Sequence, residues 1–168
     1  MKAPWIDPSA TRFLDYLQRY KTDRGALAAL RGGLSDARRP DSWPLLGGFS
    51  RDAIGNRAFE IVAALWAYEP GSVGDGNLGA TLAGLRSEHN TFEARFKRLL
   101  ACDKDEIAER VVPVVRAAQA KGKRVNYAQL LSDLLHWNDR ARTDWAKSFW
   151  GVKEPDEIAP GLVDKEDV

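Results

Sequence analysis

Lysine and arginine side chains are the groups in this sequence whose number and spacing best suit a chemical role. They fall into three groups along the chain, which are Lys21, Arg24, Arg31, Arg38 and Arg39, then Arg95, Lys97 and Arg98, and finally Lys121, Lys123 and Arg124. A surface that gathers such groups binds phosphate backbones, because each neutralised phosphate releases counterions and the arginine fork matches phosphate oxygens. The alternative is that they are solvated charges on an ordinary helical surface, since a basic patch is only an electrostatic footprint.

The residues that could support catalysis do not form a recognisable motif. His89 and His136 are far apart in the sequence, and neither a serine nor Cys102 stands with them in a nucleophile motif. An acidic cluster consists of Asp103, Asp105, Glu106 and Glu109. These acids fall on the first turns of an expected helix, where its dipole favours them, so capping explains them without a metal. We therefore predict no enzyme activity, no catalytic residue, no metal and no cofactor.

Length and composition fit one domain with an unusual end. The 168 residues are 44% hydrophobic and can fill a sizeable core. The net charge of +1 conceals an asymmetry, because residues 1–150 contain 23 Lys and Arg against 18 acids, whereas residues 151–168 contain two against six. We expect a single helical domain over residues 1–151 and an acidic, flexible tail over residues 152–168. Since neither a membrane span nor a signal peptide is evident, we expect a cytoplasmic protein.

The elements that must position the basic residues are all expected to be helices. Apolar residues recur with helical spacing, and no segment shows a convincing strand-like alternation. Ser9 is expected to cap the first helix, and Asp23 is expected to cap a second helix that Gly32 and Gly33 end.

Residues 35–49 are rich in proline and glycine and are expected to form a loop. Ser50 is then expected to begin the clearest helix, which stops at Pro70. Further helices are expected over residues 78–85, 91–99, 107–118, 127–135 and 139–150. Together these segments predict an all-α fold, a compact bundle of about seven helices with no sheet, in which most of the six tryptophans pack in the core.

Four fragments occur in an order and spacing that point to a known family. They are Phe13-Leu14 through Asp23-Arg24-Gly25-Ala26 to Leu30-Arg31, then Glu93 to Leu100, Val125 to Trp137, and Trp145 to Gly151. In this order they resemble CasB, the small subunit of the type I-E CRISPR surveillance complex Cascade, over most of residues 12–151. One departure is Gly32, because the family often has a second basic residue after the position of Arg31.

The resemblance implies a helical, non-enzymatic subunit that is present in more than one copy in a complex built on CRISPR RNA. Similar proteins contact the backbone subunits and the large subunit, and they help to hold target DNA, including its displaced strand, open as an R-loop. Base pairing reads the sequence in such a complex, so the protein needs phosphate contacts and few contacts to base edges.

Seven residues are our candidates for contact with nucleic acid. Four match basic positions of the family pattern, and they are Arg24, Arg31, Arg95 and Arg98. The other three rest on charge and on their place in an expected turn, and they are Lys121, Lys123 and Arg124.

Two other functions stay open at this point. A pure assembly protein would use aromatic and leucine surfaces to bind partner subunits, with its charges only keeping it soluble. A helix-turn-helix regulator would need a recognition helix with polar side chains for base edges. The helices expected near Leu130 and Phe96 are heavily apolar, which argues against the regulator.

Overall fold

The computed structural model describes residues 5–86 and 90–151, and every regular element in these two ranges is a helix. The α-helices of this part of the chain are α1 (Pro8–Leu17), α2 (Arg24–Arg31), α3 (Arg39–Gly47), α4 (Arg57–Trp66), α5 (Leu78–Ala83), α6 (Asn90–Leu100), α7 (Ile107–Ala120), α8 (Tyr127–Leu135) and α9 (Asp139–Trp150). Three short 3₁₀ helices are η1 (Gln18–Tyr20), η2 (Gly32–Leu34) and η3 (Arg51–Ala53). The predicted all-α fold of about seven helices without a sheet is thus confirmed.

Helix α4 forms the centre of the core. All of its residues from Ala58 to Trp66 are buried, and it contacts α2, α3, α7 and α8. A helix that is apolar on nearly every side must be covered on every side, and these four neighbours provide that cover. The one charged residue in this buried run is Glu60, whose partners are described below.

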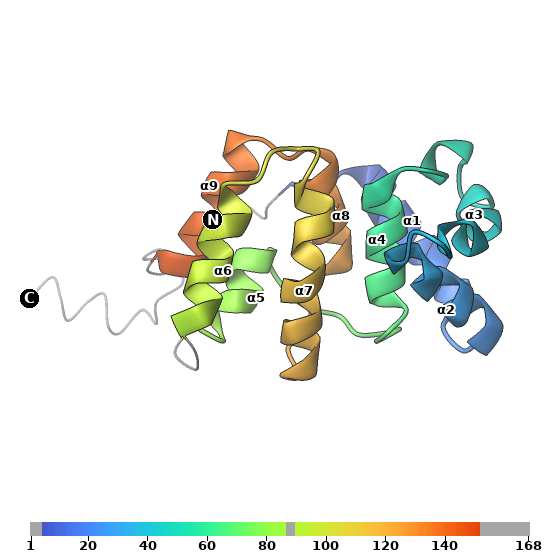
Figure 1. The fold of residues 1–168 in the computed structure, drawn as a ribbon, viewed down its shortest axis with the longest axis horizontal. Helices are drawn as coiled ribbons and strands as arrows, with labels where there is room; N and C mark the ends of the chain where they lie inside the picture. The colour runs from blue at the N-terminus through green and yellow to red at the C-terminus, as the bar shows by residue number, and fades with distance from the viewer. Residues whose placement is uncertain (1–4, 87–89, 152–168) are drawn as a thin grey trace, which may run out of the picture.

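The helices are arranged along one long axis (Figure 1). Helices α1 to α4 lie at one end, α5, α6 and α9 lie at the other, and α7 and α8 stand between them. At the second end, α5 packs directly on α9. Gly79 makes this close approach possible, because a Cβ atom at that position would overlap the backbone carbonyl of Trp145.

The predicted helix caps are confirmed at Asp23 but not at Ser9. The Asp23 carboxylate accepts a hydrogen bond from the Ala26 N–H at 3.0 Å and so begins α2. The cap of α1 is Asp7, whose carboxylate accepts from the Ser9 N–H at 2.8 Å. Pro8 takes the first helical position, where its missing N–H costs nothing.

The prediction of a loop over residues 35–49 is wrong, because residues 39–47 form α3. Pro44 lies inside this helix and removes one of its backbone hydrogen bonds. Packing compensates for that loss, since Ser42 and Leu46 are completely buried and the Trp43 indole donates to Glu60. The following segment also differs, because the helix expected from Ser50 begins only at Arg57, after η3 and a turn.

Four of the six tryptophans pack in the core or against it, as predicted, and the half-buried Trp43 is one of them. Trp66, Trp137 and Trp145 are buried, whereas Trp5 and Trp150 are exposed.

The described helices include none that is both long and apolar enough to cross a membrane. Residues 152–168, where we expect the acidic tail, lie outside the described residues, so the domain boundary at residue 151 stays a prediction.

Candidate nucleic-acid interface

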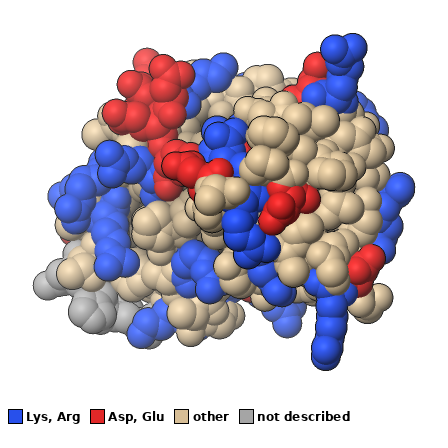
Figure 2. Space-filling view, turned by 45° about the vertical axis from the view of Figure 1, so that its right-hand side comes forward, with Lys and Arg blue, Asp and Glu red and all other residues tan. Residues whose placement is uncertain are grey.

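The seven predicted contact residues lie on three separate parts of the long axis. Helix α2 carries Arg24 and Arg31 at one end, and α6 carries Arg95 and Arg98 at the other (Figure 1). The third set directly follows α7, one of the two helices between these ends. They therefore do not form one compact patch. Figure 2 shows Lys and Arg over much of one face, with acids among them in its upper and central parts and mostly basic side chains along its lower edge.

Arg24 and Arg31 of α2 differ in their exposure and in their hydrogen-bond partners. Arg24 is the first residue of the helix and its side chain is exposed. Arg31, the last residue, is half-buried, and its Nε and Nη2 atoms donate to the Ala67 carbonyl at 3.1 Å and 2.8 Å. Arg31 therefore caps the end of α4 while its charge stays available.

Gly32 follows Arg31 in a site that has no room for a side chain. A Cβ atom there would lie 2.9 Å from the backbone carbonyl oxygen of Arg38, which requires the backbone to shift. This close approach explains why a second basic residue does not follow Arg31 in this chain.

Helix α6 presents a basic face to solvent. Phe92, Phe96 and Leu99 are buried on one side, while the other side exposes Arg95, Lys97 and Arg98. The Arg95 guanidinium lies 5.7 Å from the centre of the Phe92 ring. Within residues 5–86 and 90–151, none of these three cations forms an ion pair. Arg95 and Arg98, three residues apart on α6, therefore share the exposed face of this helix.

The basic turn after α7 is built on a glycine. Gly122 adopts a left-handed backbone with φ of 74°, and the Lys123 N–H donates back to the Ala118 carbonyl at 3.0 Å. This geometry leaves Lys121 and Arg124 exposed, while the half-buried Lys123 lies against Gly84 at the end of α5.

Arg39 and Arg57 are neutralised by a buried carboxylate and are not free for phosphate. The Glu60 carboxylate is completely buried and accepts hydrogen bonds from Arg39 at 2.8 Å, Arg57 at 2.7 Å and the Trp43 indole at 2.7 Å. Burial opposes ionisation of Glu60, but these hydrogen bonds outweigh it and lower its pKa. Arg57 also pairs with Glu109 at 2.6 Å.

Sequence reasoning missed a second cationic site, which surrounds the end of α4. Arg116 of α7 places its guanidinium carbon 3.7 Å from the centre of the Tyr68 ring, and the Arg31 guanidinium carbon lies 5.1 Å from the same centre. Tyr68 directly follows the buried α4, but it is 41% exposed. No signal in the sequence joins these residues, because they come together only through the packing of α2, α4 and α7.

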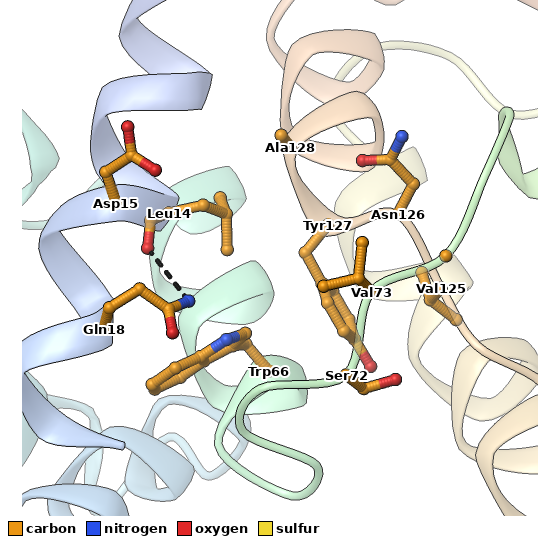
Figure 3. Close-up of a pocket in the computed structure, with 11 residues that line it drawn as sticks. Leu14, Asp15, Gln18, Trp66, Ser72, Val73, Val125, Asn126, Tyr127 and Ala128 are labelled. Carbon is orange, nitrogen blue, oxygen red and sulfur yellow. Dashed lines mark hydrogen bonds between the residues drawn. The ribbon is translucent and has the colours of Figure 1, made fainter.

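A cavity of about 180 Å³ lies between α1, the segment after α4 and the start of α8 (Figure 3). Leu14, Trp66, Val73 and Tyr127 supply apolar walls, and Asp15 is the one charged residue of its lining. Because no Lys or Arg lines it, this cavity does not suit a phosphate.

The other side chains that could take part in catalysis or metal binding have structural partners. His136 bonds the Asp7 carboxylate at 2.7 Å, and this bond is the main reason that the pKa of Asp7 is lowered. Cys102 is buried, which raises the pKa of its thiol. Asp103 accepts from the N–H groups of Asp105 and Glu106, both at 3.0 Å, in a turn ahead of α7.

Across the described ranges, no three His, Cys, Asp or Glu side chains gather where they could hold a metal ion. His89 lies outside the described residues.

The described part of the chain is helical and presents cations without carboxylate partners of its own at several points along its length. A family model for the CRISPR-associated protein Cse2 matches residues 26–150. The chain belongs to this family, also called CasB, whose members are structural small subunits of Cascade in CRISPR defence.

Three solved structures are similar along nearly their whole length. A Cse2-family CRISPR-associated protein from Thermus thermophilus is 29% identical, with 85% of this chain and 98% of that chain covered and a TM-score of 0.70. A structure described as CasB from Thermus thermophilus is 29% identical, with 90% and 100% covered and a TM-score of 0.66. CasB from M. ruber is 27% identical, with 95% and 96% covered and a TM-score of 0.68. A search among curated proteins gives no match.

Proposed function

We propose that this chain binds the nucleic-acid backbone without sequence preference and stabilises the R-loop of target DNA paired with CRISPR RNA. It acts as a non-catalytic small subunit of type I-E Cascade in the cytoplasm. Its partners are the backbone and large subunits, additional copies of itself, CRISPR RNA, and target DNA including the displaced strand. Its contacts are the seven predicted cations on α2, on α6 and in the turn after α7.

The observation that carries this proposal is the lack of carboxylate partners for exposed cations in the described residues. Arg95 and Arg98 on α6, like Arg24 on α2, are exposed and form no ion pair there. Cations spread along an axis suit a polymeric anion, since each can neutralise a different phosphate. R-loop formation is nearly balanced in energy, so a few such contacts suffice to shift it.

The test is the double variant Arg95→Ala, Arg98→Ala in the reconstituted complex. The matched control is Arg12→Ala, Arg51→Ala, which removes the same charge from two exposed residues on α1 and η3. We expect the α6 variant to shorten R-loop lifetime, and to lower the slope of log affinity against log salt by about 1.5 for single strands. Equal behaviour of the two double variants refutes the α6 assignment, and salt-insensitive binding by the wild-type complex refutes phosphate contact altogether.

A pure assembly role is the second candidate, and four exposed apolar side chains favour contacts with partner subunits. They are Trp5, Ile54, Val73 and Trp150. Co-purification with tagged Cascade subunits tests membership of the complex, and the nucleic acid that travels with it separates the two roles. Recovery only as a free monomer, without a complex that contains CRISPR RNA, contradicts both.

The helix-turn-helix regulator is less well supported than either. Helix α8 buries Tyr127, Leu130, Leu131 and Leu134, so this face is not available to base edges. The exposed face of α6 carries Arg95, Lys97 and Arg98, which suit phosphates rather than one base sequence.

A further inference from the structure

Two arginines from different elements lie at the exposed ring of Tyr68, immediately after the end of α4, and Lys21 lies against Gly71, three residues further along the chain. Arg31 comes from α2, Arg116 comes from α7, and Lys21 follows η1. The Lys21 side chain lies against Gly71, where a Cβ atom would stand 3.1 Å from its ammonium nitrogen. We call Arg31, Tyr68 and Arg116 the Tyr68 cluster.

Neutral groups hold the two guanidinium groups in place. Arg31 donates twice to the Ala67 carbonyl, at 3.1 Å and 2.8 Å. Arg116 lies over Tyr68 and donates to the Gln119 side-chain oxygen at 2.6 Å. Gln119 is itself fixed, because its side-chain N–H groups donate to the Leu65 carbonyl at 2.9 Å and to the Tyr127 hydroxyl at 2.7 Å. Both arginines are therefore oriented before any ligand arrives, which lowers the entropy cost of binding.

The cluster keeps its positive charge. Within the described residues, Lys21, Arg31 and Arg116 form no ion pair, in contrast to Arg39 and Arg57 on Glu60. Helix capping explains the place of Arg31, because cations suit the carboxyl end of a helix. It does not explain Arg116, which binds no backbone carbonyl of α4.

One carboxylate lies near the cluster. Glu69 accepts a hydrogen bond from the Tyr127 hydroxyl, and this bond, after burial, helps to raise the pKa of that hydroxyl. Among the described residues, the Glu69 carboxylate already accepts from Tyr127, and the partial negative charge at the end of α4 does not balance the two full charges of Arg31 and Arg116. The site therefore attracts an anion.

We propose that the Tyr68 cluster is a binding site for single-stranded nucleic acid, in which Arg31 and Arg116 hold the phosphate backbone and Tyr68 packs against a neighbouring sugar or base. The exposed aromatic surface favours a single strand, because a duplex keeps its bases stacked away from such contacts. This inference rests on the proposed function and adds Tyr68 and Arg116 to its contacts.

The experiment measures binding of a fluorescent oligothymidine to the full chain as a function of salt. Arg116→Ala is compared with Arg12→Ala, an exposed arginine of α1 that removes the same charge. We expect about a tenfold loss of affinity and a salt slope lower by about 0.7 for Arg116→Ala, because one preorganised phosphate contact is lost. Arg12→Ala is expected to change affinity less than twofold.

Tyr68→Leu separates packing from charge. This variant keeps every cation, so we expect affinity for the oligothymidine to fall several-fold with an unchanged salt slope. Arg116→Lys is expected to recover part of the affinity lost in Arg116→Ala, since it restores charge without the planar fork. Circular dichroism and thermal melting of each variant show whether the fold is kept. Competition by inorganic phosphate at equal phosphate concentration is expected to be weak, because a free ion lacks the contact with Tyr68.

The possible failures are distinguishable. If the wild-type chain binds with a clear salt slope but Arg116→Ala and Tyr68→Leu both behave like Arg12→Ala, the Tyr68 cluster is wrong and the proposed function stands. If inorganic phosphate competes as well as the oligonucleotide, the site binds a free anion and the strand assignment is wrong. If the wild-type chain shows no salt-dependent binding, both the cluster and the proposed function fail.

Discussion

Replacing Glu60 with glutamine tests whether its buried negative charge stabilises the fold through Arg39 and Arg57. The Glu60 side chain is completely buried, whereas the side chains of Arg39 and Arg57 keep 27% and 22% of their exposure. Glutamine retains the shape and one acceptor oxygen, but it removes the negative charge that both guanidinium groups and the Trp43 indole contact. The variant therefore leaves two half-buried cations without their shared anion.

The magnitude follows from burial. Breaking a fully buried ion pair costs about 3–5 kcal/mol, because the remaining charge is left uncompensated. Here the two arginines are partly solvated and Arg57 keeps its bond to Glu109, so we expect the free energy of unfolding to fall by about 2–3 kcal/mol for Glu60→Gln. For a domain of this size that loss lowers the melting temperature by roughly 5–10 °C.

Glu109→Gln is the matched control, because it makes the same chemical change at the other partner of Arg57. The Glu109 side chain is 54% exposed, so solvent screens its charge and we expect a loss below about 1 kcal/mol. Denaturant unfolding of both variants, monitored by circular dichroism and extrapolated to water, gives the comparison. If the two variants lose the same free energy, burial of Glu60 does not strengthen the network and our account of it is refuted.

The pH dependence of Glu60 has a definite sign. Its pKa is lowered in the folded chain, so its stabilising contribution is complete above the pKa of an unfolded glutamate and is lost as pH falls through the folded pKa. The difference in stability between wild type and Glu60→Gln is therefore expected to narrow as the solution is acidified below about pH 4. A difference that widens with acid contradicts this assignment.

Two further predictions concern Asp133 and residues 152–168. Burial raises the pKa of Asp133 to about 6, so wild-type stability is expected to fall as pH rises from about 4 to 6. Asparagine cannot ionise, so the melting temperature of Asp133→Asn is expected to stay level over that pH range. If the variant shows the same decrease as the wild type, Asp133 is not its source. Truncation after Gly151 is expected to leave the melting temperature within about 1 °C, since a solvated tail adds no packing. A drop of several degrees shows that residues 152–168 belong to the folded domain.

Helix positions could be predicted where local signals agree with packing. The carboxylate of Asp23 caps α2 as expected, because a capping bond is made within three residues of its own position, and the amide of Asn126 caps α8 in the same way. Residues 39–47 show the limit of this reasoning. Two prolines predict a loop there, but burial of Leu46 and the bond from Trp43 to Glu60 stabilise a helix that local preference disfavours.

Side-chain roles were harder to predict, because charge in a sequence does not show which cations are neutralised. Arg31 and Arg39 both stand in the first basic group, yet Arg39 pairs with the buried Glu60 and Arg31 binds a neutral carbonyl. Glu60 itself precedes a run of apolar residues, and its partners come from α3 and α4. Arg57 is three residues from Glu60 on the same helix, but only the packing of α3 on α4 brings Arg39 and Trp43 to it.

The same distinction gives a physical criterion for the surface of this protein. A guanidinium that already binds a carboxylate must lose that bond before it can bind phosphate, so its net gain from nucleic acid is small. A guanidinium held by a carbonyl, an amide or a ring keeps both its orientation and its charge, and it gains the whole charge-assisted contact. Arg31 and Arg116 meet this criterion, whereas Arg39 and Arg57 do not. Binding to single strands should therefore depend on how each arginine is held rather than on how many arginines the sequence contains.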